Sequence, residues 1–218
     1  MPPAQWPQIV LTNRATFTGH SGLNGASAFL VRTDKGRTLA ATAKHLIGPN
    51  GGVKPEIAVE ELDQAVQSWR MYPRTLPDQF FEVEKIGVPG LDGWGLDWLV
   101  LSLKAPLGAL PAVPLRMRRE PAFVGERVYL VGCPYAERSC RQNVYTGIVT
   151  ARARGDRFRY DLTPPVDIRG FSGAPILDAG GHVVGVMTIW FKTKTEGGKD
   201  LEAGAEDAAA VLALFVDQ

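Results

Sequence analysis

Glycine and proline interrupt this chain at short intervals along its whole length, and this spacing constrains the fold more than any other feature. The 218 residues include 24 glycines and 16 prolines. Turn-forming residues at this density favour many short strands joined by turns over long helices. The chain is also long enough to bury a hydrophobic core in one large domain or two small ones. We therefore predict a largely β protein.

Segments that are apolar, or that alternate between apolar and polar residues, recur in both halves of the chain, as strands do. In the first half they are Ser27–Arg32, Thr38–Ala43, Glu56–Leu62, Ala65–Met71, Phe80–Ile86 and Asp97–Leu103. In the second half they are Arg127–Gly132, Asn143–Arg152, Phe158–Leu162, Ala174–Leu177 and His182–Ile189. The proline-rich stretch Ala105–Pro114 separates the two halves.

Only the C-terminal end favours a helix. From Leu201 onwards the sequence is rich in alanine, leucine and glutamate, and its acidic residues come early, which suits the helix dipole. The predicted organisation is an N-terminal β unit over residues 1–108, a second β unit over residues 109–198 and a C-terminal helix over residues 199–218.

Bulk charge and hydropathy bear on partners and location. The formal net charge of +1 argues neither for nor against a nucleic-acid partner. No long run of like charges occurs, and the densest basic stretch, Arg152 to Arg159, is interpreted as a solvated hairpin rather than a phosphate-binding patch, so we expect no nucleic-acid partner. The apolar runs are shorter than the ~20 residues that a membrane-spanning helix needs, so we expect no membrane partner. The N-terminal segment lacks the basic and apolar regions of a secretory signal. This pattern indicates a cytoplasmic protein.

The chain has two cysteines, Cys133 and Cys140. They could close a small disulfide loop, but without a secretion signal two reduced thiols are the preferred interpretation. Two cysteines without clustered histidines do not make a metal site. We expect neither a metal nor another cofactor.

Three segments carry residues suited to nucleophilic catalysis: His45 ends the run from Ala40, Asp97 opens an apolar strand, and Ser172 lies in the loop Gly170–Pro175. A serine hydroxyl needs a base to remove its proton, and histidine suits that role because it titrates near ~6.5. A carboxylate beside the histidine holds its tautomer and stabilises the imidazolium. Asp92 is the nearest rival to Asp97, but it lies in a glycine-rich stretch that favours a solvated turn.

At these residues the sequence resembles the chymotrypsin-fold, trypsin-like serine peptidases, from roughly Ala26 to Trp190. The order histidine, aspartate, serine is also the order in that family. The resemblance implies an all-β fold of two tandem six-stranded Greek-key β-barrels, here followed by a C-terminal α-helix. It implies a serine endopeptidase that acts on protein or peptide substrates, with His45, Asp97 and Ser172 as its catalytic triad.

The same resemblance implies roles for residues near the nucleophile. The oxyanion hole would be formed by the backbone N–H groups of Gly170 and Ser172. Six residues would bind substrate, three near the specificity pocket and three in a wall that pairs with an extended peptide: Val166, Asp167, Arg169, Thr188, Ile189 and Trp190.

The departures from the family pattern concern activation. Phe171 stands where activated zymogens have an aspartate that pairs with a newly cut N-terminus. The chain therefore resembles the bacterial HtrA-like and viral branches, which do not activate in that way. Ala174 replaces a glycine, and Lys44 puts a cation beside His45.

Two other functions compete with an active endopeptidase. The first is a weak or inactive protease-fold protein that binds peptides or a partner. The second is an α/β-hydrolase esterase, but its order would be serine, acid, histidine, and no alternation of strands and helices occurs in this sequence.

Overall fold

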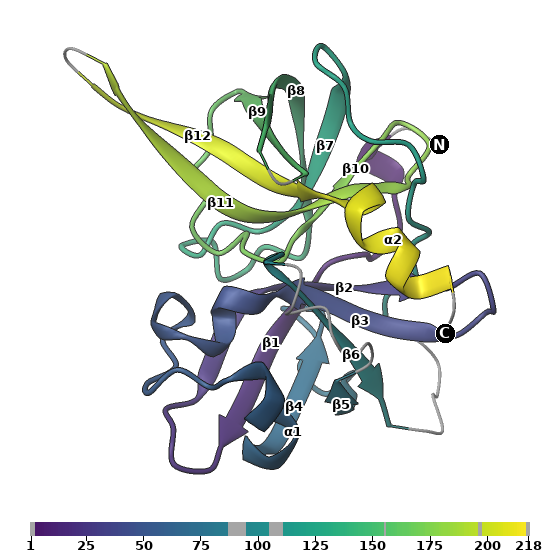
Figure 1. Ribbon diagram of the computed structural model, residues 1–218, viewed down its shortest axis with the longest axis vertical. Coiled ribbons are helices and arrows are strands. Elements are labelled where there is room, and N and C mark those ends of the chain that lie inside the picture. The colour runs from purple at the N-terminus through teal and green to yellow at the C-terminus, as the bar shows by residue number, and fades with distance from the viewer. Residues whose placement is uncertain (1–2, 87–94, 105–110, 155, 196–197, 217–218) are drawn as a thin grey trace.

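The computed structural model describes residues 3–86, 95–104, 111–154, 156–195 and 198–216, with the backbone alone described for 189–202 and 213–216. The chain forms two closed antiparallel β-barrels, stacked one above the other in Figure 1. The prediction of two six-stranded barrels with a C-terminal helix is confirmed. Asp92 and the first part of the proline-rich stretch lie outside the described residues.

The N-terminal barrel closes in the order β1-β2-β3-β6-β5-β4. Its most buried strand is β6, in which every residue from Trp98 to Leu103 is buried, as its continuous apolar sequence predicts. The strands are β1 (Leu11–Phe17), β2 (Leu23–Arg32), β3 (Thr38–Ala43), β4 (Val66–Tyr72), β5 (Phe81–Ile86) and β6 (Trp98–Leu103).

The C-terminal barrel closes in the order β10-β11-β12-β9-β8-β7, which is the same connectivity as in the first barrel. Strands β11 and β12 form a long hairpin that projects well beyond the barrel (Figure 1). The strands are β7 (Arg127–Gly132), β8 (Asn143–Ala153), β9 (Arg157–Thr163), β10 (Pro175–Leu177), β11 (Val183–Thr195) and β12 (Gly198–Asp207).

Three clusters of buried apolar residues hold the molecule together. One fills the N-terminal barrel around Trp69, and another fills the C-terminal barrel around Phe158. The third lies between the barrels, where Trp98 of β6, Val183 of β11 and Val211 of α2 (Ala208–Val216) are all fully buried. The two barrels therefore share an apolar interface, and the C-terminal helix covers its edge (Figure 1).

Short helical turns connect the strands: η1 (Pro3–Gln5), η2 (Lys44–Ile47), η3 (Pro49–Gly51), η4 (Val59–Glu61) and α1 (Leu62–Ala65). The predicted strand over Glu56–Leu62 is therefore wrong. Leu62 and Ala65, three residues apart, are both buried, which is the spacing of one helical turn. The apolar residues of this segment reach the core from turns rather than from a pleated strand.

The predicted helix from residue 199 is wrong for residues 199–207, which form β12 and complete the second barrel. Their composition favours a helix, but pairing with β11 and β9 on both sides overrides that preference. The alanines of this strand are small enough to face the barrel core, where Ala203 and Ala205 are buried. The helix itself begins at Ala208, and the Asp207 carboxylate accepts the Ala209 N–H at 3.0 Å.

The preferred interpretation of two reduced thiols is also wrong, because Cys133 and Cys140 form a disulfide. Their Cα atoms lie 5.9 Å apart across a loop with a sequence separation of 7. Turns within that loop bring the two ends together, which the sequence alone does not reveal. The cytoplasmic location stays a prediction, and the disulfide does not favour it, since disulfides are rare in that compartment.

Candidate active site

His45 and Asp97 meet because their strands pair. β3 ends at Ala43 opposite Trp98 of β6, so η2 after β3 places His45 beside Asp97. The His45 Nδ1 lies 2.5 Å from one Asp97 carboxylate oxygen, and the His45 backbone N–H donates to the other at 2.7 Å. The carboxylate therefore fixes both the backbone and the ring of His45 through its N–H and its Nδ1. Nε2 is the ring nitrogen that this contact does not use.

A second acidic residue, Glu206 of β12, lies behind Asp97. Its carboxylate accepts the Asp97 backbone N–H at 2.5 Å and the Arg157 Nε–H at 2.9 Å. Arg157 also donates to the Gly95 carbonyl at 3.3 Å. The C-terminal barrel therefore holds the segment that carries Asp97, which belongs to the N-terminal barrel.

Glu206 is fully buried, and burial raises its pKa above the usual value of a glutamate. The hydrogen bond from Asp97 and the ion pair with Arg157 oppose this rise only in part. The sequence does not reveal this residue as part of the site, because the composition of residues 199–207 favours a helix. A buried acid directly opposite an arginine on the neighbouring strand becomes visible only once β12 is recognised.

The loop that carries Ser172 is anchored to the N-terminal barrel through Ser27. The Ser27 N–H donates to the Ser172 carbonyl at 2.8 Å, and the Ser27 hydroxyl donates to the Gly170 carbonyl at 2.9 Å. Gly173 has a φ of +82°, and a Cβ there would clash with the Ser27 carbonyl oxygen. This close approach explains why the residue after Ser172 is a glycine.

Two neighbouring backbone N–H groups of this loop are free. Within the described residues, neither the Gly170 N–H nor the Ser172 N–H donates a hydrogen bond, whereas the amides of Phe171, Gly173 and Ala174 all donate to backbone carbonyls. A free pair of amides next to a serine hydroxyl is the arrangement that binds a developing oxyanion.

Hydrogen bonds to two carbonyls fix the direction of these free amides. The Arg169 carbonyl accepts the Tyr135 N–H at 2.8 Å, and the Phe171 carbonyl accepts the Ala174 N–H at 2.7 Å. A peptide unit is planar and trans, so its N–H points away from its carbonyl. Because the two carbonyls point towards the Tyr135 and Ala174 N–H groups, the Gly170 and Ser172 N–H groups point away from them.

The Ser172 hydroxyl makes no hydrogen bond to His45 within the described part of the chain. Catalytic hydrogen bonds in enzymes without substrate are often long and tighten only in the complex. The structure thus brings His45 and Asp97 into direct contact, and it places Ser172 in a loop with two free amides.

Phe171 anchors the loop that carries Ser172 to the C-terminal barrel. Its ring is fully buried in the C-terminal barrel and packs edge-to-face on Tyr145, with ring centroids 5.5 Å apart. Gly132 makes room for this ring, because a Cβ at that position would overlap it. Apolar packing therefore holds the loop at position 171. In activated zymogens an aspartate at this position holds the loop through an ion pair, which a phenylalanine cannot form.

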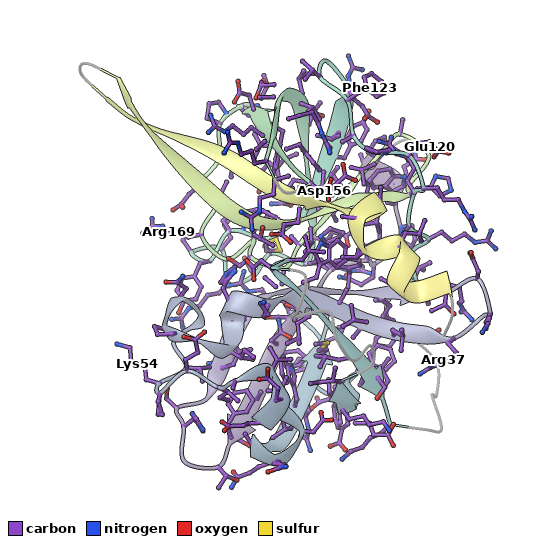
Figure 2. The ribbon with its side chains drawn as sticks, viewed as in Figure 1. Arg37, Lys54, Glu120, Phe123, Asp156 and Arg169 are labelled. Atoms are coloured by element: carbon purple, nitrogen blue, oxygen red, sulfur yellow. A yellow bond between two sulfur atoms is a disulfide. The ribbon has the colours of Figure 1, made fainter. Side chains whose placement is uncertain are left out.

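The residues expected around the specificity pocket differ in their surroundings. Val166 is half-buried and packs on the core of the C-terminal barrel. Asp167 is bound by Arg169, whose Nε lies 2.9 Å from both carboxylate oxygens, and this hydrogen bonding lowers the pKa of Asp167. Arg169 projects from the edge of the molecule near the level where the barrels meet (Figure 2).

The expected substrate wall, Thr188, Ile189 and Trp190, lies in β11. The register between β11 and β12 shifts between Met187 and Ile189, and Thr188 lies at this irregularity. The Thr188 hydroxyl is buried and has no hydrogen-bond partner among the described residues. The side chains of Ile189 and Trp190 lie outside the described part of the structure.

The sequence also matches a known protein family. Residues 26–186 match the model of the trypsin-like peptidase domain, which is most of the chain. The chain belongs to this family. In the described part of this trypsin-like peptidase domain, no three histidine, cysteine or acidic side chains cluster so as to hold a metal ion. No helix described here is long and apolar enough to cross a membrane.

Solved structures share the fold of this trypsin-like peptidase domain. The active form of the Rv3671c protease from M. tuberculosis has a TM-score of 0.61 at 19% identity, with 97% of this chain and 81% of that chain covered. The inactive form of the Rv3671c protease has a TM-score of 0.56 at 19% identity, with 96% and 88% covered. No curated protein matches the sequence significantly.

Proposed function

We propose that this trypsin-like peptidase domain is a serine endopeptidase, with Ser172 as nucleophile, His45 as general base and Asp97 as the residue that orients the base. One observation carries the proposal: the Asp97 carboxylate holds His45 through both its Nδ1 and its backbone N–H. Such a contact leaves Nε2 as the basic atom of the ring. The free amides of Gly170 and Ser172 support the same function.

The reaction then follows from these groups. His45 Nε2 removes the Ser172 proton as the Ser172 oxygen bonds to the scissile carbonyl carbon. The oxyanion that forms accepts hydrogen bonds from the Gly170 and Ser172 N–H groups. His45 delivers its proton to the leaving amine, the peptide C–N bond breaks, and an acyl-enzyme remains. His45 then takes a proton from water as the water oxygen bonds to the acyl carbon. The ester bond between that carbon and the Ser172 oxygen breaks, the acid leaves, and His45 returns the proton to Ser172.

A fluorophosphonate probe tests the nucleophile directly, because it reacts with an activated serine hydroxyl. We expect the wild-type protein to be labelled at Ser172, and Ser172→Ala to lose the label. His45→Ala and Ser172→Ala are each expected to lower kcat for peptide cleavage by a factor on the order of 10⁶, with the double variant little worse. If Ser172→Ala keeps more than about a tenth of wild-type activity, another residue is the nucleophile.

A peptide- or partner-binding module without catalysis is the second candidate. The observation that favours it is the missing hydrogen bond between Ser172 and His45 in the described structure. A binding module would leave the probe unreacted while Ser172→Ala and the wild type bind the same peptides equally well. The probe experiment therefore separates the two functions.

A further inference from the structure

A cavity of about 290 Å³ lies beside the loop Gly170–Pro175, which carries the proposed nucleophile and is called the nucleophile loop below. There the start of β2 meets the loop closed by the Cys133–Cys140 disulfide. Both barrels contribute to its lining. The residues that matter for its chemistry are Ser27, Tyr72, Arg74, Tyr135, Arg138 and Gly170.

The lining places this cavity next to the proposed oxyanion site. Gly170 supplies one of the two free amides, and Ser27 binds the carbonyls of Gly170 and Ser172. The described residues expected at the specificity pocket and the substrate wall do not line the cavity: Val166, Asp167, Arg169 and Thr188. A cavity that shares Gly170 with the proposed oxyanion site but none of those residues suits the part of a substrate that follows the scissile bond.

The cavity carries positive charge that its own walls do not balance. Arg74 and Arg138 line it, and among the described residues no aspartate or glutamate does. Arg74 donates to the Pro134 carbonyl at 2.8 Å and to the Tyr135 carbonyl at 2.9 Å, but neutral carbonyls leave its charge uncompensated. The nearby acid Glu137 bonds instead to the Asn143 side chain at 3.2 Å.

Arg138 is the cation free to meet a ligand. Its side chain is exposed, and it has no side-chain partner among the residues that the structure describes. The exposed ring of Tyr135 and the half-buried ring of Tyr72 line the same cavity. Rings beside the two arginines exclude part of the solvent, and a less hydrated site strengthens a charge pair.

The walls of the cavity are fixed before any ligand arrives. Arg74 ties the disulfide loop to the N-terminal barrel, and the Tyr135 N–H ties the same loop to the Arg169 carbonyl at 2.8 Å. The disulfide closes the loop onto itself. A site that is already ordered loses little conformational entropy when it binds.

We propose that this cavity is a subsite that selects an acidic side chain, aspartate or glutamate, at the first or second residue after the scissile bond. The carboxylate pairs with Arg138 and lies in the field of Arg74. This inference rests on the proposed endopeptidase function and adds the leaving-group side of its specificity.

The test uses matched quenched fluorescent peptides that differ only at the first two residues after the cut, where glutamate, glutamine or lysine is placed. We expect kcat/KM to be about five- to tenfold higher for glutamate than for glutamine, and lowest for lysine. The advantage of glutamate should shrink as salt is raised, because ions screen exposed charges. Arg138→Gln should bring the ratio of kcat/KM for the glutamate peptide over the glutamine peptide to about one.

Arg37→Gln is the matched control. Arg37 is an exposed arginine at a turn of the N-terminal barrel, on the opposite side of the molecule from Arg169 (Figure 2). This variant should keep the full preference for glutamate. Equal rates for glutamate and glutamine, or a preference that survives Arg138→Gln, would overturn the subsite while probe labelling still reports an active serine. A protein that cuts no peptide and leaves the probe unreacted would overturn the endopeptidase and the subsite together.

Discussion

At the scale of single residues, Glu206 has the most unusual surroundings in the site. It is a fully buried acid whose two carboxylate oxygens are bound by the Asp97 N–H and by Arg157. Buried acids are expensive unless they are paired and hydrogen-bonded. Here the pairing also fixes the backbone of Asp97, so Glu206 acts as a positioning residue for Asp97 and, through it, for His45.

The raised pKa of Glu206 predicts how stability depends on pH. In the unfolded chain a glutamate titrates near ~4.3, whereas burial raises the pKa in the folded state. As far as Glu206 is concerned, the folded protein is therefore most stable below the pKa of the unfolded state, where the carboxyl group is protonated in both states. The free energy of unfolding falls as pH rises from that pKa through the higher pKa of the folded state. Glu206→Gln does not titrate, so its melting temperature relative to the wild type should rise with pH from about 4 upwards.

Thermal unfolding of both proteins across that pH range measures this difference. If the melting temperature of the wild type instead rises relative to that of Glu206→Gln as pH rises, the ion pair with Arg157 outweighs the cost of burial.

Glu206→Gln should also lower kcat/KM. We expect the loss in kcat rather than in KM, because the residue touches Asp97 and not the substrate.

Asp167 and Arg169 bear on the residue before the scissile bond. Arg169 binds both oxygens of the Asp167 carboxylate, so this charge already has a partner within the chain. We therefore expect apolar residues such as leucine or phenylalanine to be preferred over lysine, and Asp167→Asn to change kcat/KM less than about threefold. The measurement is a series of peptides that end in Ala, Val, Leu, Phe, Lys and Arg. An advantage of ten-fold or more for lysine or arginine, abolished by Asp167→Asn, would show that Asp167 selects a cation.

At the scale of elements, the nucleophile loop depends on the ring of Phe171. Phe171→Ala would leave a cavity in the C-terminal barrel beside Tyr145, at a cost of about 3–5 kcal/mol in the free energy of unfolding. Labelling of Ser172 by the fluorophosphonate should fall as well, because the two free amides flank this residue.

Phe123→Ala provides the control for this loss. Phe123 is 63% exposed at the tip of a loop at one end of the molecule (Figure 2), and its removal should change stability by less than about 0.5 kcal/mol. Urea denaturation of both variants gives the comparison. Equal losses in the two variants would mean that Phe171 does not anchor the loop.

The elements also show what the sequence could and could not predict. The sequence alone predicted the buried strand β6 and the three catalytic candidates, because apolar runs and short motifs are local properties of a sequence. β12 was not predicted, since its alanines and acids favour a helix in isolation and only pairing with β9 and β11 makes it a strand. Glu206 and the arginine-lined cavity were missed for the same reason, as each depends on contacts between distant segments. The disulfide was considered from the sequence but not preferred, because the turns that bring its two cysteines together are not visible there.

At the scale of the whole molecule, the candidate site lies across the joint between the barrels. His45 and Asp97 come from the N-terminal barrel, and Ser172 comes from the C-terminal barrel. Contacts run across the joint in both directions: Ser27 binds the nucleophile loop, and Glu206 binds Asp97. The relative position of the barrels therefore decides the geometry of the site.

Ser27→Ala tests this dependence because it removes one hydrogen bond across the joint. We expect the free energy of unfolding to fall by about 1 kcal/mol and kcat/KM to fall up to about tenfold, since a small displacement of the Gly170 carbonyl misdirects the loop. Ser68→Ala is the matched control, because Ser68 pairs with Thr16 on the exposed side of the N-terminal barrel. A kcat/KM for Ser27→Ala equal to that of Ser68→Ala would contradict this role.

The buried ring of Phe171 has a consequence for how such an enzyme would be controlled. Packing of a phenylalanine is complete as soon as the barrel folds, and it needs no chain cleavage to create a charged end. If the proposed peptidase activity holds, the loop that carries Ser172 reaches its packed position by folding alone. Switching by a newly cut N-terminus that pairs at position 171 is then not available to this domain, because a buried aromatic ring offers no charge for that end to meet.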